Sequence, residues 1–328
     1  MTADAKRSDP FTRMLHAATF AGAAFLLLCS TIAFFPELSW MDLPGHFALQ
    51  YFVAALIGLG WSIYPLGTGV ATKAVLVTVL ALNFWLVMPY LPLPGAAPEA
   101  AAGTPLKILQ ANTMYINEDA DRFRQLIADE NPDLIVGVET NAVFAKMLAG
   151  LKTQYPYQDA QPRDHTADGL SVASKLPLNG LRVIVFTRAG MPSYTFDISR
   201  DNKDIHFIVL HTMNPLYGVE ERDAGFRGAA QNIAAYRPRN MVMLGDFNAT
   251  PWCPALRGLM RGNPELRNPR EGRGFFLSWP VALPWPARIP IDQTLVSDTI
   301  AVQDYRLGPD IGSDHFPVIS VLALKDIK

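Results

Sequence analysis

Three long apolar runs near the start of the chain limit most strongly what this sequence can fold into. They cover residues 17–35, 47–66 and 74–91, a region in which charged side chains are nearly absent. A helix of roughly 17–25 apolar residues can cross a bilayer. Trp85 and Tyr90 stand near the end of the third run, and such aromatic side chains favour the membrane–water interface. We therefore predict three transmembrane helices, which form a membrane anchor over residues 1–91.

A signal peptide followed by buried helices is the alternative interpretation of these runs. A signal peptide would account for the first run only, and that run lacks a clear small-residue cleavage site.

The charges around the runs predict their orientation. Basic residues precede the first run and lie between the second and third, whereas the loop between the first and second carries acids only. Because basic residues stay in the cytoplasm, the N-terminus is expected there and everything after Leu91 on the outer side. The basic residues are Lys6, Arg7, Arg13 and Lys73, and the acids are Glu37 and Asp42.

Residues 92–105 are rich in Pro, Ala and Gly and are predicted to be a linker. Residues 106–328 then form a domain long enough for one substantial core. Cys253 is the lone cysteine of this domain, so it predicts no disulfide there.

Short apolar runs and amphipathic stretches alternate through this domain. Two helices are expected between the first three strands and one near residues 223–236, but the middle of the domain lacks a helix after each strand. This pattern excludes a simple alternating parallel fold and favours packed sheets flanked by helices, an α/β sandwich. The ten predicted strands lie near residues 106–113, 133–140, 169–175, 181–186, 193–198, 205–212, 241–248, 291–297, 302–307 and 315–324.

Polar side chains recur where the predicted strands begin or end. Each has an ordinary explanation alone, as a turn residue, a helix cap or a satisfied core-edge histidine. Strand ends of one sheet meet in space, however, and ligand sites favour such edges. In strand alternation, Asp246 and Asn248 would point the same way. The set is Asn112, Glu139, His211, Asp246, Asn248, Asp292, Asp314 and His315.

These residue types suit the hydrolysis of a phosphate ester. Glu139 and Asp314, helped by Asn112, offer the hard oxygen ligands that Mg²⁺ or Mn²⁺ prefers. Zinc would need more His or Cys ligands than the cluster holds. Two imidazoles and further polar groups remain to activate water and to stabilise the developing charge.

The ordered motifs identify a resemblance to a known family. The stretches QAN, NPDLIVGVET, GLSVASKLPL, LHTMNP, LGDFNATP, ID and GSDHFPV occur in this order across residues 105–325. This series resembles the endonuclease/exonuclease/phosphatase superfamily, the DNase I-like fold. The resemblance implies a four-layered α/β sandwich, here preceded by three transmembrane helices, and Mg²⁺-dependent phosphoester cleavage.

The resemblance also implies a role for each residue. Asn112, Glu139 and Asp314 match the metal-proximal positions, and His211 matches the histidine that contacts the scissile phosphate. Asp246 matches the acid that positions or deprotonates water, and Asn248 matches the amide that holds a phosphate oxygen. His315 matches a base or phosphate ligand, and Asp292 matches the acid that orients it. Which group is the base stays open.

Two positions depart from the family's pattern. Gln293 follows the aspartate of the ID motif, where an aromatic residue or His is usual. Val138 precedes Glu139, where many relatives have Gln. Neither change removes a predicted ligand.

The charge of the domain bears on its substrate. Residues 105–328 hold 24 of the 28 basic and 25 of the 30 acidic residues, a net charge near −1. A nuclease would normally show a basic surface. Residues 257–273, with five Arg, are the one candidate for such a surface, and they are favoured as a solvated loop. Their Arg side chains could instead hold a pyrophosphate or an anionic headgroup.

Residues 275–290 are apolar and Pro-rich, which is unusual for the loop of a soluble enzyme. The segment includes Phe275, Phe276, Trp279 and Trp285. It either covers a sheet edge or enters the membrane interface to admit a lipid tail.

The arrangement resembles the bacterial membrane-anchored branch of the superfamily, some of whose members act on undecaprenyl pyrophosphate-type carriers of the cell envelope. It implies a multi-pass protein of the bacterial inner membrane with the catalytic domain on the periplasmic side. The predicted partners are the bilayer and a phosphorylated lipid or other phosphoester substrate; nucleic acid is less favoured, and no protein partner is evident. The alternatives are a membrane-tethered periplasmic nuclease and a non-catalytic scaffold.

Overall fold

The chain divides into two compact units, Met1–Pro89 and Tyr90–Lys328. The computed structural model describes residues 9–35, 42–63, 68–93, 98–101 and 103–325. Lys6, Arg7 and Glu37, which enter the orientation prediction, lie outside these ranges, as do residues 64–66 of the second predicted span.

Three helices, which belong to the first unit except for the boundary residue Tyr90, are long and apolar enough to cross a membrane: Pro10–Ile32, Leu43–Ile63 and Val70–Tyr90. They comprise α1 (Pro10–Ile32), η2 (Leu43–Phe47), α2 (Ala48–Ile63), α3 (Val70–Val87) and η3 (Met88–Tyr90).

The first of these helices begins earlier than its predicted start at residue 17. Asp9 caps it by accepting a hydrogen bond from the Thr12 amide, and Pro10 suits its first turn. A buried polar contact joins α1 to α3, because the Asn83 amide donates to Ser30 Oγ at 2.7 Å.

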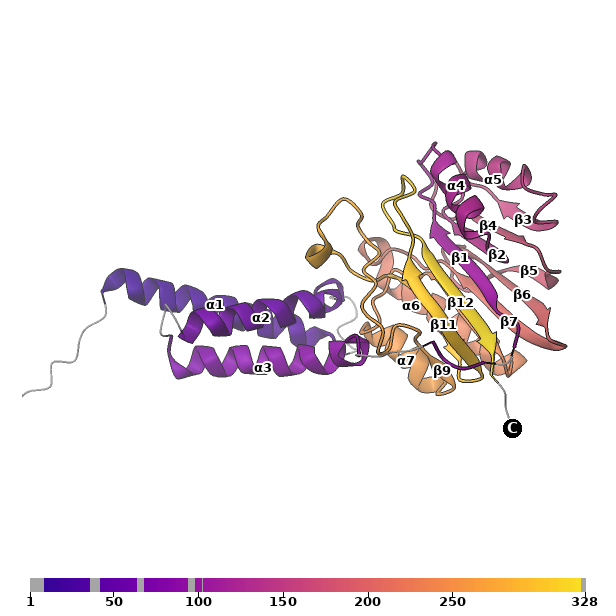
Figure 1. Ribbon diagram of the computed structural model, residues 1–328. Helices are drawn as coiled ribbons and strands as arrows, with labels where there is room; N and C mark the ends of the chain where they lie inside the picture. Colours follow the sequence, from indigo (N-terminus) through magenta and orange to yellow (C-terminus); the bar gives the residue numbers. More distant parts are fainter. Residues whose placement is uncertain (1–8, 36–41, 64–67, 94–97, 102, 326–328) are drawn as a thin grey trace, which may run out of the picture. The chain divides into compact units, whose positions relative to one another are not determined.

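The second unit consists of two six-stranded sheets (Figure 1). The first sheet has the order β11 (Ile300–Leu307), β12 (Val318–Leu324), β1 (Leu106–Asn112), β2 (Leu134–Val138), β4 (Leu170–Ser174), β3 (Tyr157–Gln161). The second has the order β5 (Asn179–Val185), β6 (Pro192–Arg200), β7 (Lys203–Leu210), β8 (Met241–Asp246), β10 (Asp292–Ser297), β9 (Leu266–Arg267). β1 and β2 are parallel, and so are β7 and β8, so each pair ends at one edge of its sheet.

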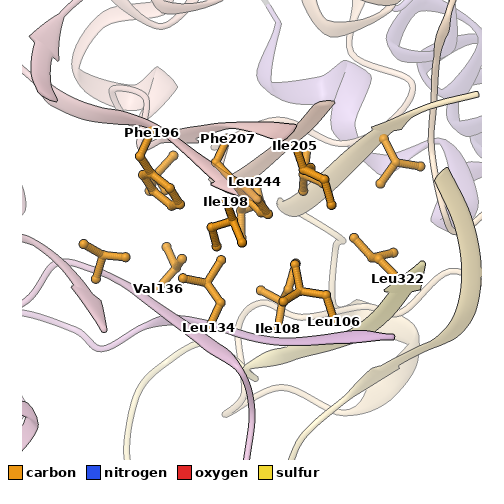
Figure 2. Close-up of a cluster of buried hydrophobic side chains, with 14 of the residues drawn as sticks. Leu106, Ile108, Leu134, Val136, Phe196, Ile198, Ile205, Phe207, Leu244 and Leu322 are labelled. Atoms are coloured by element: carbon orange, nitrogen blue, oxygen red, sulfur yellow. The ribbon is translucent and has the colours of Figure 1, made fainter. Parts of the chain in front are cut away.

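Alternate side chains of both sheets meet in a shared core. Figure 2 shows Ile108 and Val136 of the first sheet opposite Phe207 and Leu244 of the second. Phe196 and Phe207 stack with their ring centroids 5.1 Å apart. Each such side chain contributes roughly 1.5–3 kcal/mol on burial, so this layer holds the two sheets face to face.

Helices cover the outer faces of both sheets. α4 (Asp121–Glu130) and α5 (Ala142–Ala149) pack on the first sheet through Phe123 and Phe144. α6 (Pro215–Tyr236) and α7 (Pro254–Gly262) pack on the second sheet through Phe226 and Leu256. The result is the predicted four-layered α/β sandwich, and each of the ten predicted strands is present.

The described part of the predicted linker lies against the globular unit. The carboxylate of Glu99 binds Arg267 through two contacts of 2.6 Å, and it also reaches Arg273 at 3.2 Å and Lys325 at 3.5 Å. The Glu99 amide donates to the Val302 carbonyl of β11. This part of the chain is therefore held on the sandwich.

Candidate active site

The site lies at one end of the core between the two sheets, where β1 and β8 end and β10 begins. Asn112 continues the inward-facing series of β1 after Leu106 and Ile108. Asp246 does so on β8, and Asp292 pairs directly opposite Asp246 at the start of β10. The same alternation that builds the core therefore brings polar side chains together at its end.

The Asn112 side chain joins the two sheets. Its amide nitrogen donates to Glu139 Oε1 at 2.9 Å and to Asp246 Oδ2 at 3.0 Å. Its oxygen accepts from the Met114 amide at 2.9 Å. In this structure Asn112 is thus a donor to two carboxylates, while its predicted role as a metal ligand stays a prediction.

Glu139 follows β2 in a left-handed backbone conformation, with φ of 53°. Such a conformation is strained for a residue with a side chain, and it recurs at functional sites. The Thr113 hydroxyl contacts the carbonyls of Val138 and Glu139 and supports this turn. Burial raises the pKa of Glu139, and the hydrogen bond from Asn112 opposes this shift.

Asp246 lies between two imidazoles. Its Oδ2 atom is 3.8 Å from His211 Nε2 and 3.7 Å from His315 Nε2. Burial raises the pKa of Asp246 to about 6 against the opposing effect of His315, and burial lowers the pKa of His211.

Asn248 does not lie on the strand with Asp246, so strand alternation does not place its side chain. β8 ends at Asp246, and Asn248 has a left-handed φ of 44°. Its backbone amide donates to Asp246 Oδ1 at 2.8 Å, and its side chain donates to the Thr212 carbonyl at 2.9 Å. An Asx-type turn and a site position therefore coexist here.

Asp292 holds His315 in one orientation. His315 Nδ1 lies 2.8 Å from Asp292 Oδ2, and both side chains are buried. Burial lowers the pKa of His315, but the Asp292 and Asp246 carboxylates outweigh it and raise this pKa to about 10. The carboxylate thus favours a protonated ring whose Nε2 faces the site.

We expect Asp292→Asn to lower kcat for phosphoester hydrolysis by roughly 10–100-fold, since the amide keeps the shape but loses the charge behind His315. Steady-state kinetics and a thermal unfolding curve would be measured together. An unchanged kcat in a folded variant would contradict this role of Asp292.

Asp314 lies at the edge of the cluster. Its side chain is 44% exposed, its Oδ2 accepts from Trp279 Nε1 at 2.9 Å, and its Oδ1 is 3.9 Å from His315 Nε2. Trp279, which no motif in the sequence marks as a site residue, thus fixes Asp314, and its ring centroid lies 6.3 Å from that of His315.

At this site, two sets of side chains could hold a metal ion, with ligand atoms within 4.8 Å of one another: Glu139 with His211 and Asp246, and Asp246 with Asp292 and His315. Asp314 is in neither set. The Asp246 carboxylate is buried, the Glu139 carboxylate beside it is 16% exposed, and Glu139 Oε2 accepts a long 3.4 Å contact from the Tyr115 amide. A divalent cation fits these donors, because it would offset the cost of holding two acids close together in a largely buried site.

Gln293 departs from the family's pattern because it belongs to a buried network. Its oxygen accepts from Arg270 at 2.6 Å and from Asn268 at 3.2 Å. Its nitrogen donates to the carbonyls of Ala249 and Pro290. The residue holds the loops beside the site and does not face the cluster's acids.

Three Arg side chains of the stretch 257–273 are buried or bound to other parts of the globular unit. Arg267 and Arg273 bind Glu99, and Arg270 is fully buried. Of the five Arg residues, Arg261 is the exposed one. The stretch therefore presents no row of free guanidinium groups for a polyanion.

The comparisons with known proteins agree with this geometry. Residues 109–315 match the family model described as Endonuclease/Exonuclease/phosphatase family. A comparison with curated proteins yields no match.

Solved structures share the fold at low identity. D. rerio TDP2 complexed with a single-strand DNA product has a TM-score of 0.57 at 16% identity, covering 67% of this chain and 99% of that one. An endonuclease/exonuclease/phosphatase from Bacteroides vulgatus has 0.55 at 18%, covering 68% and 100%. A conserved Enterococcus faecalis V583 protein, described as functionally unknown, has 0.54 at 17%, covering 67% and 100%.

Fold, site and family model together define a metal-dependent hydrolase of phosphate esters. The chain belongs to the endonuclease/exonuclease/phosphatase family.

Proposed function

We propose that the protein is a membrane-anchored, Mg²⁺-dependent phosphatase or phosphodiesterase that acts on a lipid-linked phosphate of the undecaprenyl pyrophosphate type. Its proposed location is the bacterial inner membrane, with the catalytic unit on the periplasmic side. The observation that carries the proposal is the joining, in one chain, of a phosphoester site to three helices long enough to span a bilayer.

The residues of the site support an in-line attack by water on phosphorus. Asp246 holds and deprotonates the water, because its Oδ2 faces the cluster. Asn248 and His211 donate to phosphate oxygens. The His315 ring, held by Asp292, donates to the charge that develops as the bond from phosphorus to the leaving oxygen breaks. A Mg²⁺ ion held beside Glu139 would supply electrostatic stabilisation of the phosphoryl group.

The charge distribution supports a lipid substrate over a nucleic acid. The globular part has a net charge near −1, with 24 of the chain's 28 basic and 25 of its 30 acidic residues in 105–328. Within its Arg-rich stretch, Arg267 binds Glu99, and Arg270 and Arg273 donate to backbone carbonyls. A small phosphorylated headgroup needs few cationic contacts, whereas a polymer needs many.

The variant Glu139→Gln tests whether Glu139 helps to bind the metal ion. The variant is expected to need at least about tenfold more Mg²⁺ for half-maximal activity, because a neutral amide is a weaker ligand for a hard cation. Glu118→Gln, at an exposed glutamate, is the matched control and should titrate as wild type. Equal Mg²⁺ requirements for Glu139→Gln and wild type would contradict this assignment.

The substrate class is tested with the full chain in detergent. Phosphate release from undecaprenyl pyrophosphate and nicking of plasmid DNA would be measured in parallel with Mg²⁺. The proposal expects release without nicking. Nicking without release would assign the site to a nuclease, the class to which the DNA-bound D. rerio TDP2 structure points.

A further inference from the structure

Exposed apolar side chains gather at the end of the sandwich that carries the site. Tyr217 is 84% exposed, Leu216 67%, Ile116 60% and Trp285 58%. Each stands on a segment next to a site residue: Ile116 follows Asn112, and Leu216 and Tyr217 follow His211. The set, named here the apolar rim, is Ile116, Val143, Leu216, Tyr217, Leu283 and Trp285.

The segment that carries Leu283 and Trp285 has a held shape. In Figure 1 it is the golden loop with one helical turn, η4 (Trp285–Ala287). Its base closes where Trp279 and Ile289 exchange backbone hydrogen bonds, and the Val281 amide donates to the Asp314 carbonyl. Arg288 donates to the carbonyls of Val281 and Leu283. The tip is therefore braced against the site while its apolar side chains face solvent.

The first half of residues 275–290 behaves differently. Phe276 packs edge-on against Tyr305 with centroids 5.1 Å apart, and Leu277 is buried. The first half of the segment therefore covers a sheet end, as one interpretation predicts, and the second half presents an exposed apolar tip; its entry into a membrane interface stays a prediction.

The chain enters the globular unit at this same end. Tyr90, the first residue of that unit, packs against Trp252 with ring centroids 6.1 Å apart. Trp252 lies in the segment that leaves the end of β8 just after Asn248. Tyr90 also closes the third candidate span. The globular unit therefore begins, along the chain, at the end that carries the site.

In the described chain, the exposed aromatic residues Tyr157 of β3 and Tyr236 of α6 lie toward the opposite end, on different elements. Tyr157 begins β3 opposite Ser174, which pairs with Leu134 at the start of β2. Isolated exposed residues of this kind are normal on protein surfaces, whereas a gathered set marks an interaction site.

We propose that the apolar rim lies in the headgroup layer of a phospholipid bilayer, so that the active site opens directly onto the membrane surface. Trp and Tyr favour this depth, and Leu and Ile add buried apolar area. The inference rests on the proposed membrane anchoring. It adds that substrate reaches the site laterally from the bilayer, without leaving it for water.

The test uses the full chain in nanodiscs of phosphatidylcholine and phosphatidylglycerol, with and without lipids that carry a fluorescence quencher near the headgroup. A dye is attached at Trp285→Cys, at Tyr217→Cys or, as the control, at Tyr157→Cys. The native Cys29 and Cys253 are buried, which favours labelling of the introduced thiol. Lipid quenching is expected to be several-fold stronger at 285 and 217 than at 157.

Equal, weak lipid quenching at all three positions would overturn the proposal. Shielding of position 285 from aqueous iodide without lipid quenching would also overturn it and would point to a protein partner. Two rim positions guard against one variant that fails to fold. Strong quenching at 285 and 217 in a protein that releases no phosphate from the lipid would support the rim while refuting the proposed substrate.

Discussion

Asp246→Asn is expected to lower kcat for phosphoester hydrolysis by roughly 10²–10⁴-fold, the usual contribution of a positioned base. The change keeps the shape of the side chain, so Asn248 can still donate to the remaining oxygen. It removes the negative charge that lies 3.8 Å from His211 and 3.7 Å from His315. Steady-state hydrolysis of bis(p-nitrophenyl) phosphate by the full chain with Mg²⁺ measures the effect.

The matched control for this variant is Asp298→Asn. Asp298 is exposed and follows β10 at the end remote from Asp292. It should retain wild-type kcat and the same unfolding curve. If Asp246→Asn kept wild-type kcat, Asp246 could not be the group that deprotonates water.

Arg270→Ala is expected to lower the free energy of unfolding by about 3 kcal/mol or more, because hydrogen bonds to a charged group are lost and buried acceptors stay unpaired. Arg270 is fully buried and donates to Gln293 Oε1 and to the carbonyls of Asp292 and Phe275. Its guanidinium also lies 5.3 Å from the Tyr305 ring centroid. Loss of these contacts loosens the start of β10, which carries Asp292.

Denaturant unfolding of Arg270→Ala and of Arg261→Ala separates this effect from the loss of a surface charge. Arg261 is exposed and should change stability by less than about 0.5 kcal/mol. Similar unfolding midpoints for both variants would contradict a structural role for the Arg270 network.

The strands can be predicted because their side chains alternate between the core that the two sheets share and the helices on the outer faces. β3 was missed because its sequence, YQDAQ, has no buried position. β9 has only two residues, and α7 carries Gly and Arg within its sequence PALRGLMRG. α6 starts at Pro215, earlier than the apolar pattern indicates, because Asn214 caps it. The capping residue thus sets the start of the helix, which the apolar periodicity alone predicts too late.

The site was predictable where it continues a strand and unpredictable where loops build it. Asn112, Asp246 and Asp292 follow from alternation and strand ends. The contact of Trp279 with Asp314 depends on a loop whose course periodicity does not encode. The tie between Glu99 and Arg267 joins residues 168 positions apart, a distance at which a single sequence carries no pairing signal.

Phosphate release from undecaprenyl pyrophosphate, by the full chain in detergent with Mg²⁺, is the decisive measurement for a metal-dependent lipid phosphatase that uses Asp246. Wild type and Asp246→Asn would be compared before and after chelation of the metal. We expect release by wild type that stops on chelation, returns with added Mg²⁺ and falls by roughly 10²–10⁴-fold in the variant. No release by folded wild type, or equal release by the variant, would contradict it.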